Sequence, residues 1–332
     1  MKNLKIYLIF LALTSSLVAC NDEWKEELYE NLVSFKAPIN SEGVYNVYMR
    51  YTKDGEINYD LPVIVSGSQA LEKDLKVKIA VDNDTLSVLN RARFQYREDL
   101  YFKQLPEQFY EFSTPGIVIP KGSHTANYKI RFKFSNLDLV ERWVLPLTIV
   151  DDLSYKANYR KGWRKALLQI KPFNNYSGNY SATAMNVYFD GESKSTVTST
   201  RTAYVVDENS VFFYAGLIEE DAVDRANYKV VMEFGEAVDQ GDGTLRGTIM
   251  LKAANPAINL EVLNQPTYQI KRSADATLPY LVREYCTVNL EYKYNDITSI
   301  PALPIRYKAQ GTMTMERQRN TLIPDEDQAI QW

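Results

Sequence analysis

The sequence predicts a mainly β protein made of two antiparallel domains. Polar and apolar residues alternate with period two in many short segments, which is typical of strands with one face in water. Aromatic residues make up 12% of the chain, and they fit the half-buried surface of a sheet. Clusters of glycine, proline, asparagine and serine separate the segments, as turns between strands require.

The first half contains three clear strand patterns, at residues 74–82 (DLKVKIAVD), 127–134 (NYKIRFKF) and 142–150 (RWVLPLTIV). Pro146 interrupts the third pattern. Because proline cannot donate to a strand ladder, we expect an edge position or a bulge there. Residues 84–96 have a helix-like pattern and predict one short crossover helix. Otherwise this half is typical of a β-sandwich with Ig-like character.

A domain boundary is predicted within residues 171–181 (KPFNNYSGNYS), where turn-forming residues follow a complete strand. The boundary divides the chain into an Ig-like β-sandwich at 35–172 and a second domain at 173–332. Eight or so short strand patterns follow it, and these predict either an antiparallel β-sandwich or an up-and-down barrel. Periodicity alone leaves these two architectures open.

The first 19 residues predict a secretory signal peptide. Lys2 and Lys5 precede an apolar run that is too short to span a bilayer, and small residues follow it. The sequence LVAC that ends at Cys20 resembles a bacterial lipobox, in which the cysteine thiol accepts a diacylglycerol. We therefore expect removal of residues 1–19, lipid attachment at Cys20 and a tether at 20–34. The alternative is an ordinary signal peptide that ends near a cysteine.

The acidic run at residues 21–23 (Asn-Asp-Glu) resembles the export signal of surface lipoproteins of the Bacteroidetes type. It implies a chain that is anchored in the outer membrane by its lipid and faces outside the cell. Two of the 38 basic residues lie in the signal peptide, so the mature chain carries 36 against 42 acidic residues, a formal charge of −6. This balance gives no basic surface for nucleic acid.

Few residues are available for catalysis or metal binding. The chain has one histidine, His124, in a turn-like segment, and Cys286 is the only thiol apart from Cys20. These two residues cannot supply the ligands of a usual zinc site, and no nucleotide-binding motif is present, so we expect no cofactor. Segments 82–85 and 239–244 are rich in oxygen ligands but are interpreted as plain turns rather than calcium sites.

Aromatic side chains are the candidate ligand contacts, because their flat faces fit sugar rings while polar neighbours bind the hydroxyls. Two segments combine aromatic with polar residues, at 153–165 (LSYKANYRKGWRK) and 174–181 (NNYSGNYS). The alternative is that these rings pack within the sheets. The candidate glycan-binding residues are Tyr155, Tyr159, Trp163, Arg164, Tyr176 and Tyr180.

Residues 44–152 contain, in order, NVYM, YDLPVIVSG, DLKVKIAVD, LPEQFYEF, GIVIPKG and WVLPLTIVDD. This series resembles the Ig-like N-terminal domain of unknown function in Bacteroidetes-type surface lipoproteins of polysaccharide-utilisation loci. That domain also precedes the catalytic domain of some endoglycosidases. The remainder, from about residue 175, resembles a second uncharacterised β-domain that accompanies it in non-catalytic members. The resemblance supplies no catalytic or binding motif.

These features favour a non-catalytic, lipid-anchored accessory protein that binds a glycan or oligosaccharide. The resemblance implies a porin-type importer and its associated surface lipoproteins as partners. One alternative is a scaffold that binds the neighbouring uptake proteins without touching glycan. Another is a glycoside hydrolase with an unlocated carboxylate pair, since that chemistry tolerates any sequence spacing.

Overall fold

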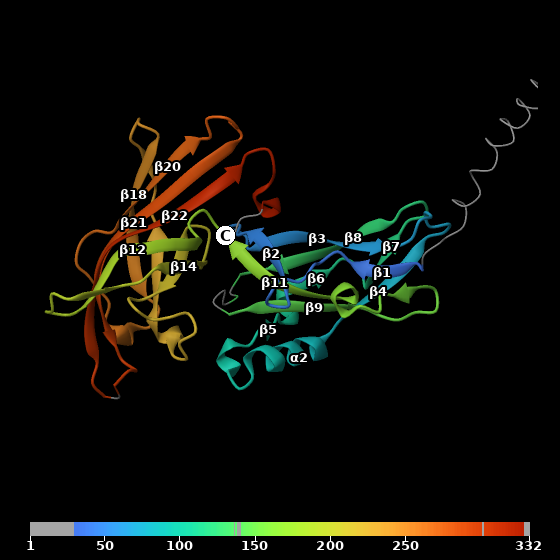
Figure 1. Cartoon of the computed structure of the whole chain (residues 1–332), viewed down its shortest axis with the longest axis horizontal. Helices are drawn as coiled ribbons and strands as arrows, with labels where there is room; N and C mark the ends of the chain where they lie inside the picture. Colours follow the sequence, from blue (N-terminus) through green and yellow to red (C-terminus); the bar gives the residue numbers. More distant parts are fainter. Residues whose placement is uncertain (1–29, 136, 138–140, 301, 329–332) are drawn as a thin grey trace, which may run out of the picture.

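The computed structural model describes residues 30–135, 137, 141–300 and 302–328. Within these ranges two β-domains lie end to end (Figure 1). Their strands confirm the mainly β fold class that the alternating pattern predicts. In the same ranges, no helix has the length and apolarity that a membrane crossing requires.

The N-terminal domain is a β-sandwich, as predicted. One sheet contains, from edge to edge, β10 (Lys156–Ala157), β1 (Leu32–Phe35), β3 (Glu56–Val65), β8 (Thr125–Lys133) and β6 (Tyr110–Phe112). The other contains β2 (Tyr45–Arg50), β11 (Lys165–Phe173), β9 (Trp143–Ile149), β4 (Leu75–Val81) and β7 (Gly116–Ile119), with β5 (Lys103–Gln104) beside β9. In β8, Ile130 and Phe132 are fully buried between the sheets while Lys129 is exposed, so the predicted alternation places its apolar residues in the core.

Strand β1 begins inside the segment that the sequence assigns to the tether. Leu32 pairs with Lys156 of β10, and Val33 pairs with Val65 of β3. Val33 and Phe35 are fully buried. The described sandwich therefore begins at Leu32, three residues before the predicted boundary. A strand of four residues is too short for periodicity to separate it from a tether.

The expectation of an edge or a bulge at Pro146 is wrong, because β9 lies inside its sheet between β11 and β4. Proline is tolerated because β9 changes partner at this residue. The carbonyl of Pro146 accepts a hydrogen bond from Asp82 N at 2.9 Å, just beyond the end of β4, while that of Val144 accepts one from Leu105 N, just beyond β5. The missing N–H of Pro146 thus faces the gap between these two partners.

The predicted crossover helix is present as α2 (Asn83–Phe94). Asp82 caps it by accepting hydrogen bonds from the backbone N–H and the hydroxyl of Thr85. Leu86 of α2 packs on the outer face of the β11 sheet, in an apolar cluster with Val44, Phe102, Val144 and Leu167. The helix covers only part of this face. Short helical turns complete the domain, namely η1 (Glu98–Leu100), η2 (Glu107–Phe109) and α3 (Lys161–Arg164).

The second domain is an antiparallel barrel, which resolves the choice that periodicity left open. Eight strands of the described chain form its ring, in the order β12 (Gly178–Phe189), β14 (Thr200–Val205), β15 (Ser210–Tyr214), β16 (Lys229–Phe234), β18 (Thr244–Ala253), β20 (Thr267–Ala274), β21 (Leu281–Asp296) and β22 (Ile305–Asn320). The ring closes because β22 pairs with both β21 and β12. Smaller elements are β13 (Ser195–Val197), β17 (Val238–Asp239), β19 (Glu261–Val262), η3 (Arg225–Tyr228), η4 (Pro256–Ile258) and η5 (Asp325–Asp327).

The interior of the barrel is filled by its own side chains. Tyr180, Tyr228 and Tyr292 are buried there, and their hydroxyls bond to protein atoms; that of Tyr228 donates to Asp296 at 2.8 Å. Cys286 is a free, fully buried thiol in the same core, as expected, and burial raises its pKa to about 11. A barrel of this size is just wide enough for its side chains to fill. A ligand site must therefore be sought outside the lumen.

Candidate functional site

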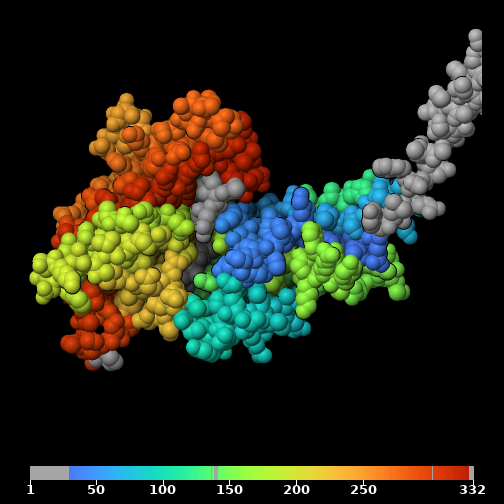
Figure 2. Space-filling view, viewed as in Figure 1, coloured from blue at the N-terminus to red at the C-terminus, as the bar shows by residue number. Residues whose placement is uncertain are grey.

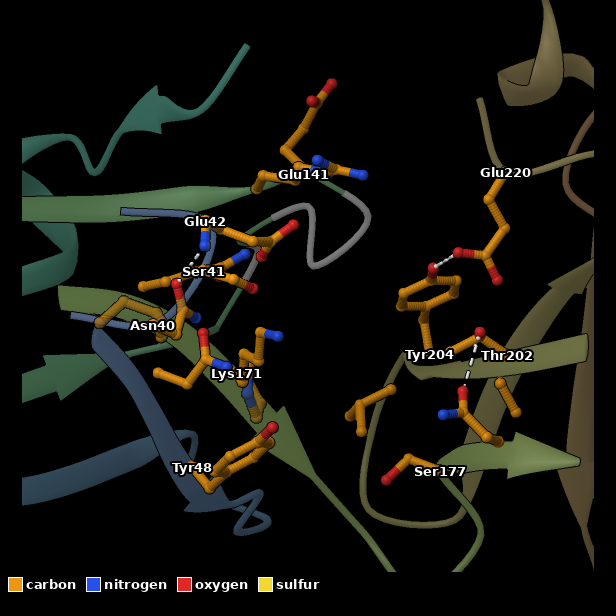
Figure 3. Close-up of a pocket in the computed structure, with 18 of the residues that line it drawn as sticks. Asn40, Ser41, Glu42, Tyr48, Glu141, Lys171, Ser177, Thr202, Tyr204 and Glu220 are labelled. Atoms are coloured by element: carbon orange, nitrogen blue, oxygen red, sulfur yellow. Dashed lines mark hydrogen bonds between the residues drawn. The ribbon is translucent and has the colours of Figure 1, made fainter. Parts of the chain in front are cut away.

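A cleft of about 590 Å³ lies between the two domains. One wall comes from the sandwich, chiefly β2, β11 and the loop at residues 40–42, and the opposite wall comes from β12, β14 and Glu220 of the barrel (Figure 3). Its volume falls within the range of small-molecule sites. The lining is mostly polar and includes Asn46, Tyr48, Arg93, Arg142, Gln169, Lys171, Asn179, Thr202 and Tyr204.

Contacts between the domains in the described part of the chain include two groups of charged side chains. In the first, Arg225 of the barrel donates to the carbonyl and the carboxylate of Asp99, at 2.8 Å and 3.3 Å. Hydrogen bonds from Arg97 and Arg225 lower the pKa of Asp99 to about 2. Figure 2 shows this contact as the meeting of the cyan segment near α2 with the gold segment of the barrel. In the second, Arg50 of β2 pairs with Asp325, which also binds Arg319 of β22.

The sandwich wall is the part of the sheet face that α2 leaves uncovered. β2 and β11 run parallel, with Asn46 opposite Gln169 and Tyr48 opposite Lys171. Neighbouring residues such as Leu168 point to the opposite face and into the core. Along β11 the outer face thus changes from apolar Leu167 under the helix to polar side chains in the cleft.

Two amide oxygens on this wall have no hydrogen-bond partner within the described part of the chain. Gln169 is 6% exposed, and its Oε1 is buried without a partner among the described residues. Oδ1 of the neighbouring Asn46 is in the same condition. A buried polar atom without a partner costs about 1–3 kcal/mol, and most native proteins avoid it. These two oxygens lie side by side and face the cleft. A ligand that brings hydrogen-bond donors into the cleft would satisfy both.

Two cations on the same wall, Lys171 and Arg142, lack carboxylate partners among the described residues. Lys171 lies over the ring of Tyr48, with Nζ 5.8 Å from the ring centroid, and burial lowers the pKa of its ammonium group. Within the described chain, no carboxylate lies at ion-pair distance from it. Arg142 lies over Phe94 and likewise has no ion pair there. By contrast, Nη2 of Arg93 is 3.6 Å from Glu42.

The barrel wall presents hydroxyl and aromatic groups. Thr202 of β14 donates to Oδ1 of Asn179 at 3.0 Å, and Tyr204 donates to Glu220 (Figure 3). The ring of Tyr204 is stacked on Phe212, with centroids 5.0 Å apart. Burial, followed by the nearby Glu220 carboxylate, raises the pKa of Tyr204, so the phenol keeps its proton at neutral pH.

The aromatic candidates from the sequence are dispersed, and none lines this cleft. Tyr180 is fully buried inside the barrel, and Tyr155 is 9% exposed with its hydroxyl bonded to the Val150 carbonyl. These two rings are therefore unavailable to a ligand, and their assignment is wrong. The ring of Tyr176 stacks on that of Phe234, with the ring centroids 3.8 Å apart. In both domains these tyrosines complete sheet packing, which is the role that the alternative gave them.

The remaining candidates lie outside the cleft. Tyr159, just before α3, and Trp163, within it, are exposed, at 72% and 44%. Arg164 is paired with Asp151 at 2.8 Å. Cys20 lies outside the described residues. Sequence reasoning missed the cleft residues themselves, although the glutamine inside the apolar run ALLQIKPF, residues 166–173, is a signal that could have identified Gln169.

Comparisons with known proteins match one family model to each half of the chain. A family model described as a domain of unknown function (DUF4973) matches residues 24–153, in agreement with the resemblance seen in residues 44–152. A second model, described only as a C-terminal domain, matches residues 164–314. No curated protein matches the chain at a significant level.

Solved structures from Bacteroides share the whole architecture. A Bacteroides ovatus protein of unknown function is 45% identical, with 91% of this chain and 100% of that chain covered and a TM-score of 0.79. A B. ovatus multidomain protein that includes DUF1735 is 44% identical, with 90% and 99% covered and a TM-score of 0.78. An auxiliary nutrient binding protein from Bacteroides thetaiotaomicron is 35% identical, with 92% and 100% covered and a TM-score of 0.76. The chain therefore belongs to this family of two-domain Bacteroides proteins, with the DUF4973 domain at its N-terminal end.

Proposed function

We propose that this protein is a non-catalytic, nutrient-binding accessory of a glycan uptake system, and that it holds an oligosaccharide in the cleft between its domains. The observation that carries the proposal is the buried amide oxygen of Gln169, which lacks a partner among the described residues and faces the cleft next to that of Asn46. Sugar hydroxyls are donors that match these acceptors. A relative described as an auxiliary nutrient binding protein supports the nutrient role.

The carboxylates of the cleft favour binding over catalysis. Glu42 is engaged by Arg93, Glu141 pairs with Lys103 at 2.6 Å, and Glu220 accepts from Tyr204. Carboxylates that are held in place by protein side chains in this way can orient a bound ligand. Glycoside hydrolysis instead needs one protonated and one free carboxylate that face each other across the bond to be cleaved.

The binding test uses residues 21–332, which contain every described strand, and a broad panel of complex glycans. Calorimetry should detect binding of at least one glycan, and a reducing-sugar assay should detect no new ends. New reducing ends that disappear on substitution of one cleft carboxylate would establish a hydrolase. Absence of binding across the panel, together with co-purification of an importer, would favour the scaffold alternative.

The location of the protein is part of the same proposal. A diacylglycerol on Cys20 would anchor the chain in the outer membrane, facing outside the cell, beside a porin-type importer and its lipoproteins. Confinement to a membrane turns modest single-site affinity into efficient capture through effective concentration. The Cys20→Ala variant should lose metabolic labelling by fatty acid, with wild type as the control. Label retained by this variant would refute the anchor without bearing on the cleft.

A further inference from the structure

We propose that the cleft selects acidic saccharides, and that Lys171 and Arg142 bind the carboxylate of one uronic acid unit. This inference rests on the proposed function and names the substrate class of the same site. It adds a requirement for negative charge that the amide oxygens alone do not impose.

Lys171 and Arg142 both line the cleft from the sandwich domain. Register pairs Gln169 of β11 with Val144 of β9. Lys171 lies two residues beyond Gln169, and Arg142 lies two residues before Val144, immediately ahead of β9. Burial lowers the pKa of Lys171, and the charge of Arg142, which lines the same cleft, adds to this shift. Two like charges close together destabilise each other unless an anion lies between them.

The described chain supplies no such anion. Glu42 also attracts Lys171, but its carboxylate is nearer to Arg93, 3.6 Å from Nη2, and outside ion-pair distance of Lys171. Glu141 is engaged by Lys103, and Glu220 belongs to the opposite wall. A ligand carboxylate would satisfy both cations, and the planar guanidinium of Arg142 matches its two oxygens.

The spacing of the polar side chains along β11 fits one sugar unit. Gln169 and Lys171 are two residues apart on one face of β11, so their side chains emerge about 7 Å apart. One sugar ring with a carboxylate on one side and hydroxyls on the other spans a comparable distance. A single uronic acid unit could therefore donate hydroxyls to the amide oxygens of Asn46 and Gln169 while its carboxylate meets the cations. Neutral sugars would leave the cations unsatisfied.

The test compares an oligouronide with the same oligosaccharide in methyl-esterified form, which keeps the hydroxyls and removes the charge. Calorimetry on residues 21–332 should show at least tenfold tighter binding of the acid. Lys171→Met should abolish this preference and leave binding of the ester within twofold. Lys161→Met, at an exposed lysine outside the cleft, is the matched control and should retain the preference for the acid over the ester. A sulfated oligosaccharide tests the other source of negative charge and should bind more weakly than the uronide.

Equal affinity of wild type for acid and ester would overturn the inference, as would tighter binding of the sulfated ligand or equal effects of the two lysine substitutions. Preference for a neutral glycan that depends on Gln169 would also overturn it and would leave the proposed function intact. Failure of every glycan in the broad panel is the separate result that would refute the proposed function itself.

Discussion

Replacing Gln169 with leucine is expected to stabilise the fold by about 1 kcal/mol and to weaken ligand binding tenfold or more. The side chain is nearly fully buried, and its Oε1 has no partner among the described residues. Leucine has a similar volume and no polar atom, so the substitution removes the cost of the unsatisfied oxygen. It also removes the acceptor that the ligand would use. Stability and affinity should therefore change in opposite directions.

Denaturant unfolding and calorimetry with the best glycan of the panel measure the two effects on one preparation. The matched control is Gln269→Leu, at an exposed glutamine on strand β20, which should change neither quantity appreciably. A loss of stability of more than about 1 kcal/mol in Gln169→Leu would mean that the amide is already satisfied within the protein. An unchanged glycan affinity in Gln169→Leu would show that Gln169 does not contact the ligand.

Replacing Gly311 with alanine is expected to destabilise the barrel by roughly 3 kcal/mol or more. Gly311 lies in β22 at the seam that closes the ring, opposite Met185 of β12, where the register of β12 shifts. Its φ of +136° is a conformation that side chains rarely adopt, and an added Cβ would lie 2.0 Å from the carbonyl oxygen of Ala184. The strand would have to move away from β12, so backbone strain and the loss of closure add together.

Far-ultraviolet circular dichroism during urea unfolding measures this effect. Gly191→Ala is the control, because Gly191 also has a positive φ, +91°, in the barrel domain but has open space around it. Gly191→Ala should lower the free energy of unfolding only by the backbone strain, about 1 kcal/mol. Similar unfolding midpoints for the two variants would contradict the close approach of the backbones at the seam.

The fold could be predicted largely because each strand carries its own local pattern. The alternation in residues 127–134 is sufficient to place Ile130 and Phe132 in the core. The sequence contains no comparable local pattern for the pairing of strands that are far apart along the chain. Barrel closure depends on β22 meeting β12, more than a hundred residues earlier, and Pro146 fits inside a sheet only because β9 changes partner there.

The candidate site could not be predicted in the same way, because it forms where two domains, each with its own core, meet. Tyrosine content pointed to sugar-binding platforms, yet rings such as Tyr180 satisfy the packing of a β-core. The residues that indicate the site are polar side chains on the outer face of the sheet, at the point where this face leaves the apolar cluster under α2 and enters the cleft. Gln169, between the buried Leu168 and Ile170, is the one whose position in the sequence already conflicts with an ordinary core strand.

A crystal structure of residues 21–332 with the tightest-binding oligosaccharide of the panel tests the central claim most directly. We predict ligand density between β11 and β14, with a sugar hydroxyl within hydrogen-bond distance of Gln169 Oε1 and a second one near Asn46 Oδ1. Density against the exposed rings of Tyr159 and Trp163, with the cleft between the domains empty, would contradict it.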